Sequence, residues 1–157
     1  DDRALVVVAG ADEALLDGGG SLVGAGRLDE DGYIYFVDRI QDTIRRRGEN
    51  ISSMEVESII GRHPSIAECA AFPVPSEHTE YDVMISIVLK PGENADPEGI
   101  IRFAEKEMSY FMVPRYIDFV PALPKTQTGK VQKNVLRTTG VSASTWDRDV
   151  AGIKVAR

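Results

Sequence analysis

Apolar and β-branched residues over the first third of the chain come in short runs separated by turn residues, which predicts short strands. The apolar run 4–9 predicts a buried strand, and the glycine-rich stretch 10–26 is predicted to be a loose connection. Asp31-Gly32 is a turn signal just before the β-rich run Tyr33–Val37, so we expect a hairpin there. A second short strand is expected at 43–45.

The apolar spacing then changes to a helical period over residues 50–64. Ser52 and Glu55 fit a capping box, and the apolar residues after them recur at the intervals of one helix face. Gly61 and Pro64 are typical of a helix end. We therefore expect a helix that begins near Ser52 and stops before Pro64.

The remaining pattern predicts two strands, a helix, a strand and a last short helix. Apolar runs mark strands at 65–75 and 81–90, and Asp96-Pro97 is a good N-cap and first position for a helix to about Met108. A short strand is expected at 116–120 and a helix of about two turns at 130–137.

This order predicts an α+β fold, in which a small β-sheet with a β-hairpin carries two or three packed helices. Residues 26–137 form the predicted domain, and residues 1–25 form an atypical N-terminal segment or linker. Residues 138–157 mix Thr, Ser, Gly and charges around a lone Trp146, and we expect a poorly ordered tail.

Composition limits the classes of partner. The chain has 157 residues, of which 43% are hydrophobic and 27% charged, as in soluble globular proteins. A net charge of −7 argues against a general binder of nucleic acid or anionic membranes. No apolar run approaches the ~20 residues that cross a bilayer. Basic clusters in such a chain point instead to a small anion bound at one place.

Cysteine and histidine residues are too few for a disulfide or a convincing zinc site. Cys69 is the single cysteine, so no internal disulfide can form and a reducing cytoplasm is the expected location. Its alanine-rich flanks indicate a buried small hydrophobe and not a reactive thiol. His63 and His78 with one cysteine do not make a zinc site, and we expect no metal site.

Three lysines and no acidic residue occupy the stretch LPKTQTGKVQK, residues 123–133. It is not a phosphate-binding P-loop, because Pro124 stands where the first glycine is needed and Val131 follows Lys130. Two interpretations remain. Lys130 is a movable point charge that meets a phosphate or carboxylate, or the stretch is a solvated loop.

A second basic cluster, Arg45 to Arg47, precedes Gly48. In a strand, Arg45 and Arg47 would share one face and Arg46 the other, and Gly48 would allow a sharp turn or close approach to a ligand. The alternative is a solvated edge strand that its charges protect from aggregation. Arg39 lies between Asp38 and Asp42 in the sequence, so it could instead form an ion pair at the surface and have no functional role.

Three separated motifs resemble the C-terminal domain of the adenylate-forming (acyl-CoA synthetase, AMP-binding) superfamily. They are GRLDEDGYIYFVDRIQDTIRRRGENISSMEVESII, HPSIAECAAFPVP and FMVPRYIDFVPALPKTQTGKVQKNVLR. Together they cover residues 26 to about 137 in the family's order, and the variant is most similar to the crotonobetaine/carnitine-CoA ligase type. The resemblance implies a mobile lid domain.

Members of that family join a carboxylic acid to ATP, release pyrophosphate, and transfer the acyl group to the thiol of CoA. The resemblance implies that Lys130 bridges the carboxylate and the α-phosphate during adenylation. It places Arg39 near the ribose and phosphates, and Gln41 at the hinge position, where the family more often has Asp or Lys. It makes residues 45–50 the loop of the thioester step; Arg45, Arg47, Gly48 and Glu49 would line the CoA tunnel.

The resemblance also implies partners that this sequence does not contain. ATP or AMP, CoA and Mg²⁺ would be bound with a large N-terminal adenylation domain, in cis or in trans, and the small domain would be inactive alone. Residues 19–25 lack the aspartate with which the family holds the ribose hydroxyls. The alternative is a non-catalytic binding or regulatory paralogue. The acyl substrate, the oligomeric state and the origin of residues 1–25 stay open, as does the choice between a fragment, a split subunit and a degenerate paralogue.

Overall fold

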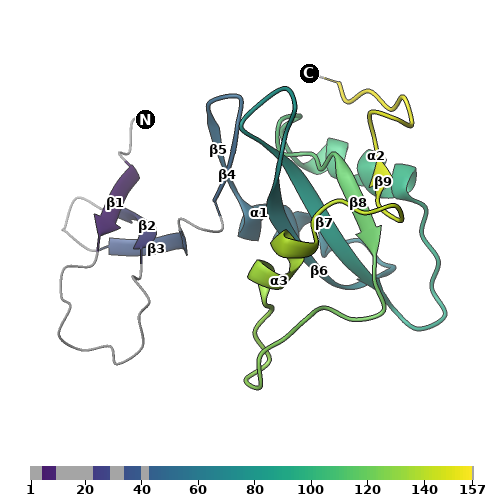
Figure 1. Cartoon of the computed structure of the whole chain (residues 1–157), viewed down its shortest axis with the longest axis horizontal. Coiled ribbons are helices and arrows are strands. Elements are labelled where there is room, and N and C mark those ends of the chain that lie inside the picture. Colours follow the sequence, from purple (N-terminus) through teal and green to yellow (C-terminus); the bar gives the residue numbers. More distant parts are fainter. Residues whose placement is uncertain (1–4, 10–22, 29–33, 40–42, 157) are drawn as a thin grey trace.

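The computed structural model describes residues 5–9, 23–28, 34–39 and 43–156 (Figure 1). The first three strands form an antiparallel sheet in the order β1-β2-β3, and they are β1 (Leu5–Ala9), β2 (Val23–Leu28) and β3 (Ile34–Arg39). This confirms the first strand and the pairing of the expected hairpin, whose Asp31-Gly32 turn lies outside the described residues.

The expectation of a loose connection through residue 26 is wrong at its end, because Val23–Gly26 belong to β2, where Val23 pairs with β1 and the next three residues pair with both neighbouring strands. Two adjacent strands give these residues backbone partners, which outweighs their small side chains. The division of the chain into 1–25, 26–137 and 138–157 stays a prediction.

A short hairpin precedes the first helix. It consists of β4 (Thr43–Arg46) and β5 (Glu49–Ser52), and its register pairs Ile44 with Ile51, both fully buried. β4 is confirmed, whereas β5 was not expected and overlaps residues 50–52, which lie at the start of the helical pattern. The alternation that buries Ile44 and Ile51 on one face favours a strand there.

The first helix, α1 (Ser53–Ile60), begins and ends at the expected local signals. The Ser52 side chain accepts a hydrogen bond from the Glu55 amide at 3.4 Å, which confirms Ser52 as the N-cap. The amide of Gly61, the C-cap, donates to the Glu57 carbonyl at 2.8 Å.

The main sheet has four strands in the order β6-β7-β8-β9. Its β6–β7 and β8–β9 pairs are antiparallel, and its β7–β8 pair is parallel. The helix α2 (Pro97–Glu107), capped by Asp96, connects the two parallel strands, and α3 (Lys133–Thr139) follows the lysine loop. The strands are β6 (Ile66–Pro75), β7 (Tyr81–Leu89), β8 (Tyr116–Phe119) and β9 (Trp146–Asp147).

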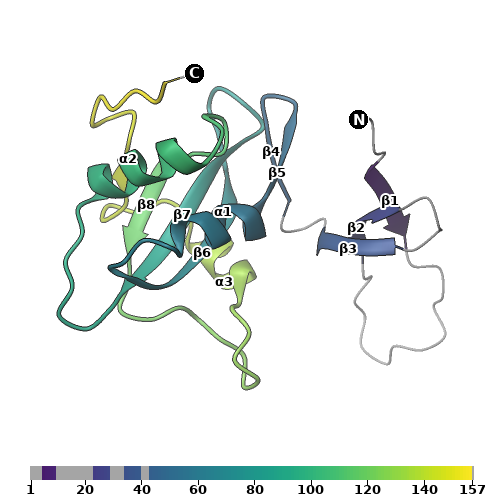
Figure 2. The ribbon, with the colours of Figure 1, turned by 180° about the vertical axis from the view of Figure 1, so that it is seen from behind.

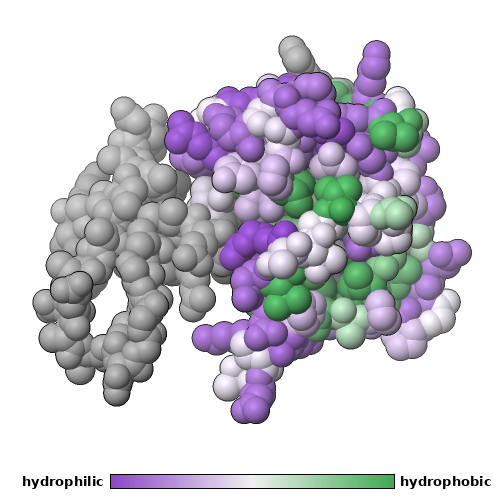
Figure 3. Space-filling model, viewed as in Figure 1, coloured by the Kyte–Doolittle hydropathy of each residue, from purple (hydrophilic) through white to green (hydrophobic). Residues whose placement is uncertain are grey.

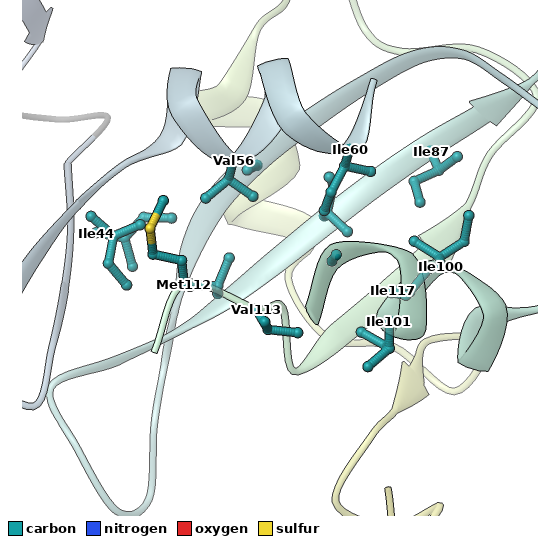
Figure 4. Packing of buried hydrophobic residues seen from close by; sticks show 14 of the residues in the cluster. Ile44, Val56, Ile60, Ile87, Ile100, Ile101, Met112, Val113 and Ile117 are labelled. Carbon is teal, nitrogen blue, oxygen red and sulfur yellow. The ribbon is translucent and has the colours of Figure 1, made fainter. Parts of the chain in front are cut away.

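Helices cover both faces of this sheet: α1 and α2 lie on one face and α3 on the other (Figures 1 and 2). Alternate residues of β7 divide between them. Val83, Ile85 and Ile87 pack into the cluster with the isoleucines of α1 and α2, of which Figure 4 shows Ile87 beside Ile60 and Ile100. Met84 packs with Leu136 of α3 in the other cluster. The fold is α+β, as expected.

The C-terminal segment corrects one expectation. A poorly ordered tail was predicted from residue 138, but α3 continues to Thr139 and β9 then pairs with β8. Trp146, Ile153 and Val155 are partly buried against the larger core cluster. These apolar residues are widely spaced in the sequence, so no periodic pattern marks them, and only the folded sheet shows where they pack.

Candidate functional site

The loop of residues 124–132 is a tight turn bonded to itself at its base. An isolated antiparallel bridge joins Lys125 to Val131, and the Gln132 amide donates to the Pro124 carbonyl at 2.8 Å. In Figure 1 the loop projects from the lower end of the domain. Its backbone is therefore paired within the loop although its tip extends into solvent.

Hydroxyl groups brace the tip. The Thr126 amide donates to the Lys130 carbonyl at 2.8 Å, and the Gly129 amide donates to the Thr126 carbonyl at 3.0 Å. The Thr126 hydroxyl accepts from the Lys130 amide at 3.2 Å and lies 3.0 Å from the Thr128 hydroxyl. Gly129 has a φ of +84°, a conformation that suits glycine, so the turn holds Lys130 in a defined place.

The three lysines of this stretch differ in their contacts. Lys125 forms an ion pair with Glu68, and Lys133 lies 2.6 Å from Glu57 Oε1 with a side chain that is only 13% exposed. Lys130 is exposed, and no hydrogen bond or ion pair joins its ammonium to any residue of 43–156. Within the described structure, Lys130 is therefore the lysine of this stretch that is available to an external anion.

The basic cluster that follows β4 forms the two-residue turn of the β4–β5 hairpin. Arg46 pairs with Glu49, and between them Arg47 has a φ of +51° and Gly48 a φ of +79°. Two successive positive φ values match the right-handed twist of a hairpin. The expectation that Arg45 and Arg47 share a strand face is wrong, because the strand ends at Arg46 and Arg47 belongs to the turn.

Glu80, from the loop before β7, supports this turn. Its carboxylate accepts from the Arg47 amide at 3.1 Å and lies 3.9 Å from the Arg45 guanidinium. Arg45, Arg47 and Glu49 are exposed. A Cβ atom added at Gly48 would meet no atom within 4 Å, so the backbone here is open to close approach from outside.

Arg46 was not predicted as a functional residue, yet it is the buried member of the cluster, 6% exposed. Its Nη1 donates to the carbonyl of Phe111 at 3.0 Å and to that of Val113 at 3.4 Å, and its Nε lies 3.4 Å from Asp82 Oδ1. Burial lowers the pKa of Arg46. The sequence signal that could have identified Arg46 is the alternation along β4. Residue 46 stands two positions after the buried Ile44, so its side chain lies on the same, inward face of the strand.

Arg115 extends this buried network to the C-terminal segment. Its Nη1 donates to Asp82 at 3.0 Å, and its Nη2 and Nε donate to the two Asp147 oxygens at 3.0 and 3.1 Å. The hydrogen bonds with Asp147 raise the pKa of Arg115. Arg148, next in sequence, donates to the Val113 and Pro114 carbonyls at 3.3 Å each. The β4–β5 turn and β9 are thus joined through charged side chains.

A cavity of about 230 Å³ opens beside the turn. Arg46, Arg47, Arg148 and Lys154 contribute positive charge to its wall, and Tyr110 contributes a ring. Among the described residues, the buried Nε atoms of Arg46 and Arg148 have no hydrogen-bond partner, although each lies within 4 Å of a carboxylate, of Asp82 and Asp149 respectively. Four cationic side chains against one carboxylate, that of Asp149, make the cavity suited to an anion.

Comparison with known proteins identifies the family. Residues 55–130 match the model of the AMP-binding enzyme C-terminal domain. A probable CoA ligase of Humulus lupulus is 37% identical over 111 residues, which cover 71% of this chain and 21% of that protein. The crotonobetaine/carnitine–CoA ligase of Proteus mirabilis is 38% identical over 112 residues, 71% of this chain and 22% of that one. The chain belongs to the AMP-binding enzyme C-terminal domain family.

The solved structures agree with this assignment. ATP-bound MatB from Rhodopseudomonas palustris superposes with a TM-score of 0.68 at 32% identity, covering 74% of this chain and 23% of that chain. The chain thus spans about a fifth of the length of the curated relatives that it matches. The expected resemblance to this C-terminal domain is confirmed.

The two basic elements of this AMP-binding enzyme C-terminal domain lie apart. The β4–β5 turn, with Arg47 and Gly48, is at the upper end of the domain and the loop with Lys130 is at the lower end, in both views (Figures 1 and 2). The structure therefore does not bring the predicted catalytic lysine together with the predicted CoA-tunnel residues.

The remaining predicted residues are described only in part. Arg39 is the last residue of β3, and its backbone pairs with Gly24. Gln41 lies outside the described residues. The roles of both stay predictions.

Cys69 packs at the edge of the domain's larger core cluster. It is half-buried, its thiol donates to the Glu57 carbonyl at 3.5 Å, and burial raises its pKa to about 12. Among the residues that the structure describes, no group of three or more His, Cys, Asp or Glu side chains is arranged to hold a metal ion. Nor does any described helix have the length and apolar character to cross a membrane.

Proposed function

We propose that this C-terminal domain serves an ATP-dependent acyl-CoA ligase, in which Lys130 assists adenylation. The supporting observation is the exposed Lys130 ammonium, without a protein partner in the described structure, on a turn that hydrogen bonds brace. The neighbouring lysines are engaged by Glu68 and Glu57, so the loop carries one available positive charge at a defined place.

The chemistry of the first half-reaction requires such a charge. A carboxylate oxygen attacks the α-phosphorus of ATP, the new C–O–P linkage forms, and pyrophosphate leaves with the electrons of the broken P–O bond. Two anions must approach each other, and an ammonium group between them offsets both their repulsion and the charge that develops. Mg²⁺ and the nucleotide would be held by the large adenylation domain, with Arg39 near the ribose and phosphates.

The β4–β5 turn is proposed to act in the second half-reaction, in which the CoA thiol displaces AMP from the acyl-adenylate. Gly48 leaves the backbone open to the pantetheine arm, with Arg45, Arg47 and Glu49 along its path. The cavity lined by Arg46, Arg47 and Arg148 offers charge complementary to the phosphates of CoA.

The separation of the two elements supports a rotation of the whole domain between half-reactions, with Gln41 at the hinge. One end presents Lys130 and the other presents Gly48, so one orientation cannot place both at the same reacting carbonyl (Figure 1). The domain would therefore be inactive without the large domain, in cis or in trans. The single cysteine favours a reducing cytoplasm as the location.

The decisive experiment is complementation. A related CoA ligase that lacks its own C-terminal domain is mixed with this chain, and acyl-adenylate formation is measured in a single turnover by pyrophosphate release. We expect the chain to restore adenylation, and Lys130→Ala to reduce the restored rate by about 100-fold or more. Lys106→Ala, which removes an exposed lysine of α2, is the matched control. Restoration that survives Lys130→Ala would refute the role of Lys130.

The second candidate, a non-catalytic binding paralogue, is favoured by the absence of an aspartate from residues 19–25. Calorimetric titration of the chain with ATP, AMP and CoA tests it. Binding of one of these ligands together with a failure to restore adenylation would support the paralogue over the ligase domain.

A further inference from the structure

A second cavity, unrelated to the β4–β5 turn, lies on the α3 face of the main sheet. Its volume is about 440 Å³, within the range of roughly 300–1,000 Å³ typical of small-molecule sites. Its walls are mostly apolar and come from β6, β7, the segment after β8, and α3; they include Phe72, Met84, Val120, Leu123 and Leu136. Figure 3 shows hydrophobic surface beside α3 on this face.

Two polar side chains meet in this apolar cavity. Ser86 of β7 and Asp118 of β8 are register partners in the parallel pair, so their side chains lie next to each other on the same face of the sheet. Ser86 is 2% exposed. Asp118 is half-buried, and no described residue forms a hydrogen bond or an ion pair with its carboxylate.

An unpaired carboxylate in such a place is costly to the protein. Burial raises the pKa of Asp118, because an apolar surrounding disfavours the charged form. By contrast, the other half-buried or buried aspartates of the sheet region, Asp82 and Asp147, are both paired with Arg115. A cation that entered the cavity would supply the partner that the described chain does not.

We propose that this cavity binds a small primary ammonium compound with an apolar body. The ammonium would donate charge-assisted hydrogen bonds to the Asp118 carboxylate and a hydrogen bond to the Ser86 hydroxyl. The hydrocarbon body would lie against Phe72, Met84 and Leu136. A carboxylic acid would be repelled by Asp118, and a neutral compound would lose the ionic contact, so the cavity selects a cation.

The site stands independently of the proposed ligase function, although it adjoins the lysine loop. Leu123 and Pro124, which line the cavity, lead directly into the turn that carries Lys130, and Leu136 follows it on α3. A ligand in the cavity would therefore contact the segment that leads into the turn and the helix that follows it.

The test is a titration of the intact chain with 2-phenylethylammonium at pH 7.5, followed by ¹H–¹⁵N NMR. We expect saturable shifts confined to β7, β8, α3 and the 120–124 segment, with a dissociation constant of about 1 mM or tighter. The neutral 2-phenylethanol, of similar shape, should bind at least about tenfold more weakly. The same loss is expected for the ammonium with Asp118→Asn.

Two further variants keep the test decisive. Glu77→Gln removes an exposed carboxylate outside the cavity lining and should leave binding unchanged. Val135→Lys places a competing cation at an exposed cavity residue and should weaken binding while Asp118 is retained. Absence of saturable binding, equal binding of amine and alcohol, or full binding by a folded Asp118→Asn would each overturn the proposal.

Discussion

Asp82 is the residue at which the buried charges of the domain can be tested most directly. Its side chain is 5% exposed and accepts from Arg115 Nη1 at 3.0 Å, while its other oxygen lies 3.4 Å from Arg46 Nε. Asp82→Asn keeps the shape of the side chain and removes its charge. The change leaves Arg46, which is 6% exposed, without its closest carboxylate.

The expected cost follows from what the substitution leaves unpaired. Arg115 retains Asp147, so its charge remains compensated on one side. Arg46 retains the carbonyls of Phe111 and Val113, which accept from Nη1, and only the weaker attraction of Asp149 as a counter-charge. Breaking a buried pair by removing one partner costs about 3–5 kcal/mol. That is a large part of the roughly 5–15 kcal/mol by which a domain is stable.

Urea unfolding of the chain, followed by circular dichroism, measures this free energy. Glu107→Gln is the matched control, because the Glu107–Arg62 pair spans 4.0 Å between exposed side chains and should contribute little. We expect Asp82→Asn to lower the free energy of unfolding by about 3–5 kcal/mol. A loss below about 1 kcal/mol would show that the Arg46 charge is compensated without Asp82, and would refute the argument.

Three further predictions concern single positions. Gly48→Ala should lower the free energy of unfolding in urea by about 1–3 kcal/mol, because alanine is strained at a φ of +79°. Gly48→Asn should lower it by less, since asparagine tolerates a positive φ, and equal losses for the two variants would contradict the argument. Cys69, with a pKa of about 12, should resist iodoacetamide at pH 8 in the native chain and react in urea, as mass spectrometry will show; rapid native labelling would contradict it. Burial tends to raise the pKa of Asp147, but hydrogen bonds from Arg115 and the Asp149 amide hold it below its usual 3.8. The stability that ionised Asp147 contributes is therefore present above pH 3.8 and is lost as the pH falls through the lowered pKa. The difference in unfolding free energy between the unmodified chain and Asp147→Asn should accordingly shrink on acidification, and a constant difference would contradict this.

Local signals predicted much of the fold because they act within one turn of chain. The Ser52 and Asp96 side chains cap α1 and α2 by accepting hydrogen bonds from amides two or three residues away. Such caps can be predicted from the sequence because residue type and short spacing are enough to mark them. The local stretch around Lys130 left two interpretations open, and the role predicted for Lys130 came from the resemblance of three separated motifs to the family.

Features that depend on distant partners were missed. The sequence RRRGE does not indicate that Arg47 adopts a φ of +51°, a conformation supported by Glu80 from 33 residues away. The same holds for Arg46, whose partners are Phe111, Val113 and Asp82, and for the C-terminal segment, which is ordered by β8 and Arg115. In each case the deciding contact joins residues too far apart in sequence for periodicity to reveal it.

The contacts that were missed also explain how one small domain can present two basic elements as a rigid body. Arg46 and Arg115 join the β4–β5 hairpin to the sheet and to β9 at one end. At the other, Lys133 joins α3 to Glu57 of α1, and the same Glu57 oxygen accepts from the Ala71 amide of β6 at 2.9 Å. If the two elements act in turn at one external site, as proposed, the domain would have to turn as a unit, since the β4–β5 hairpin cannot bend toward the lysine loop without breaking its buried ion pair with Asp82.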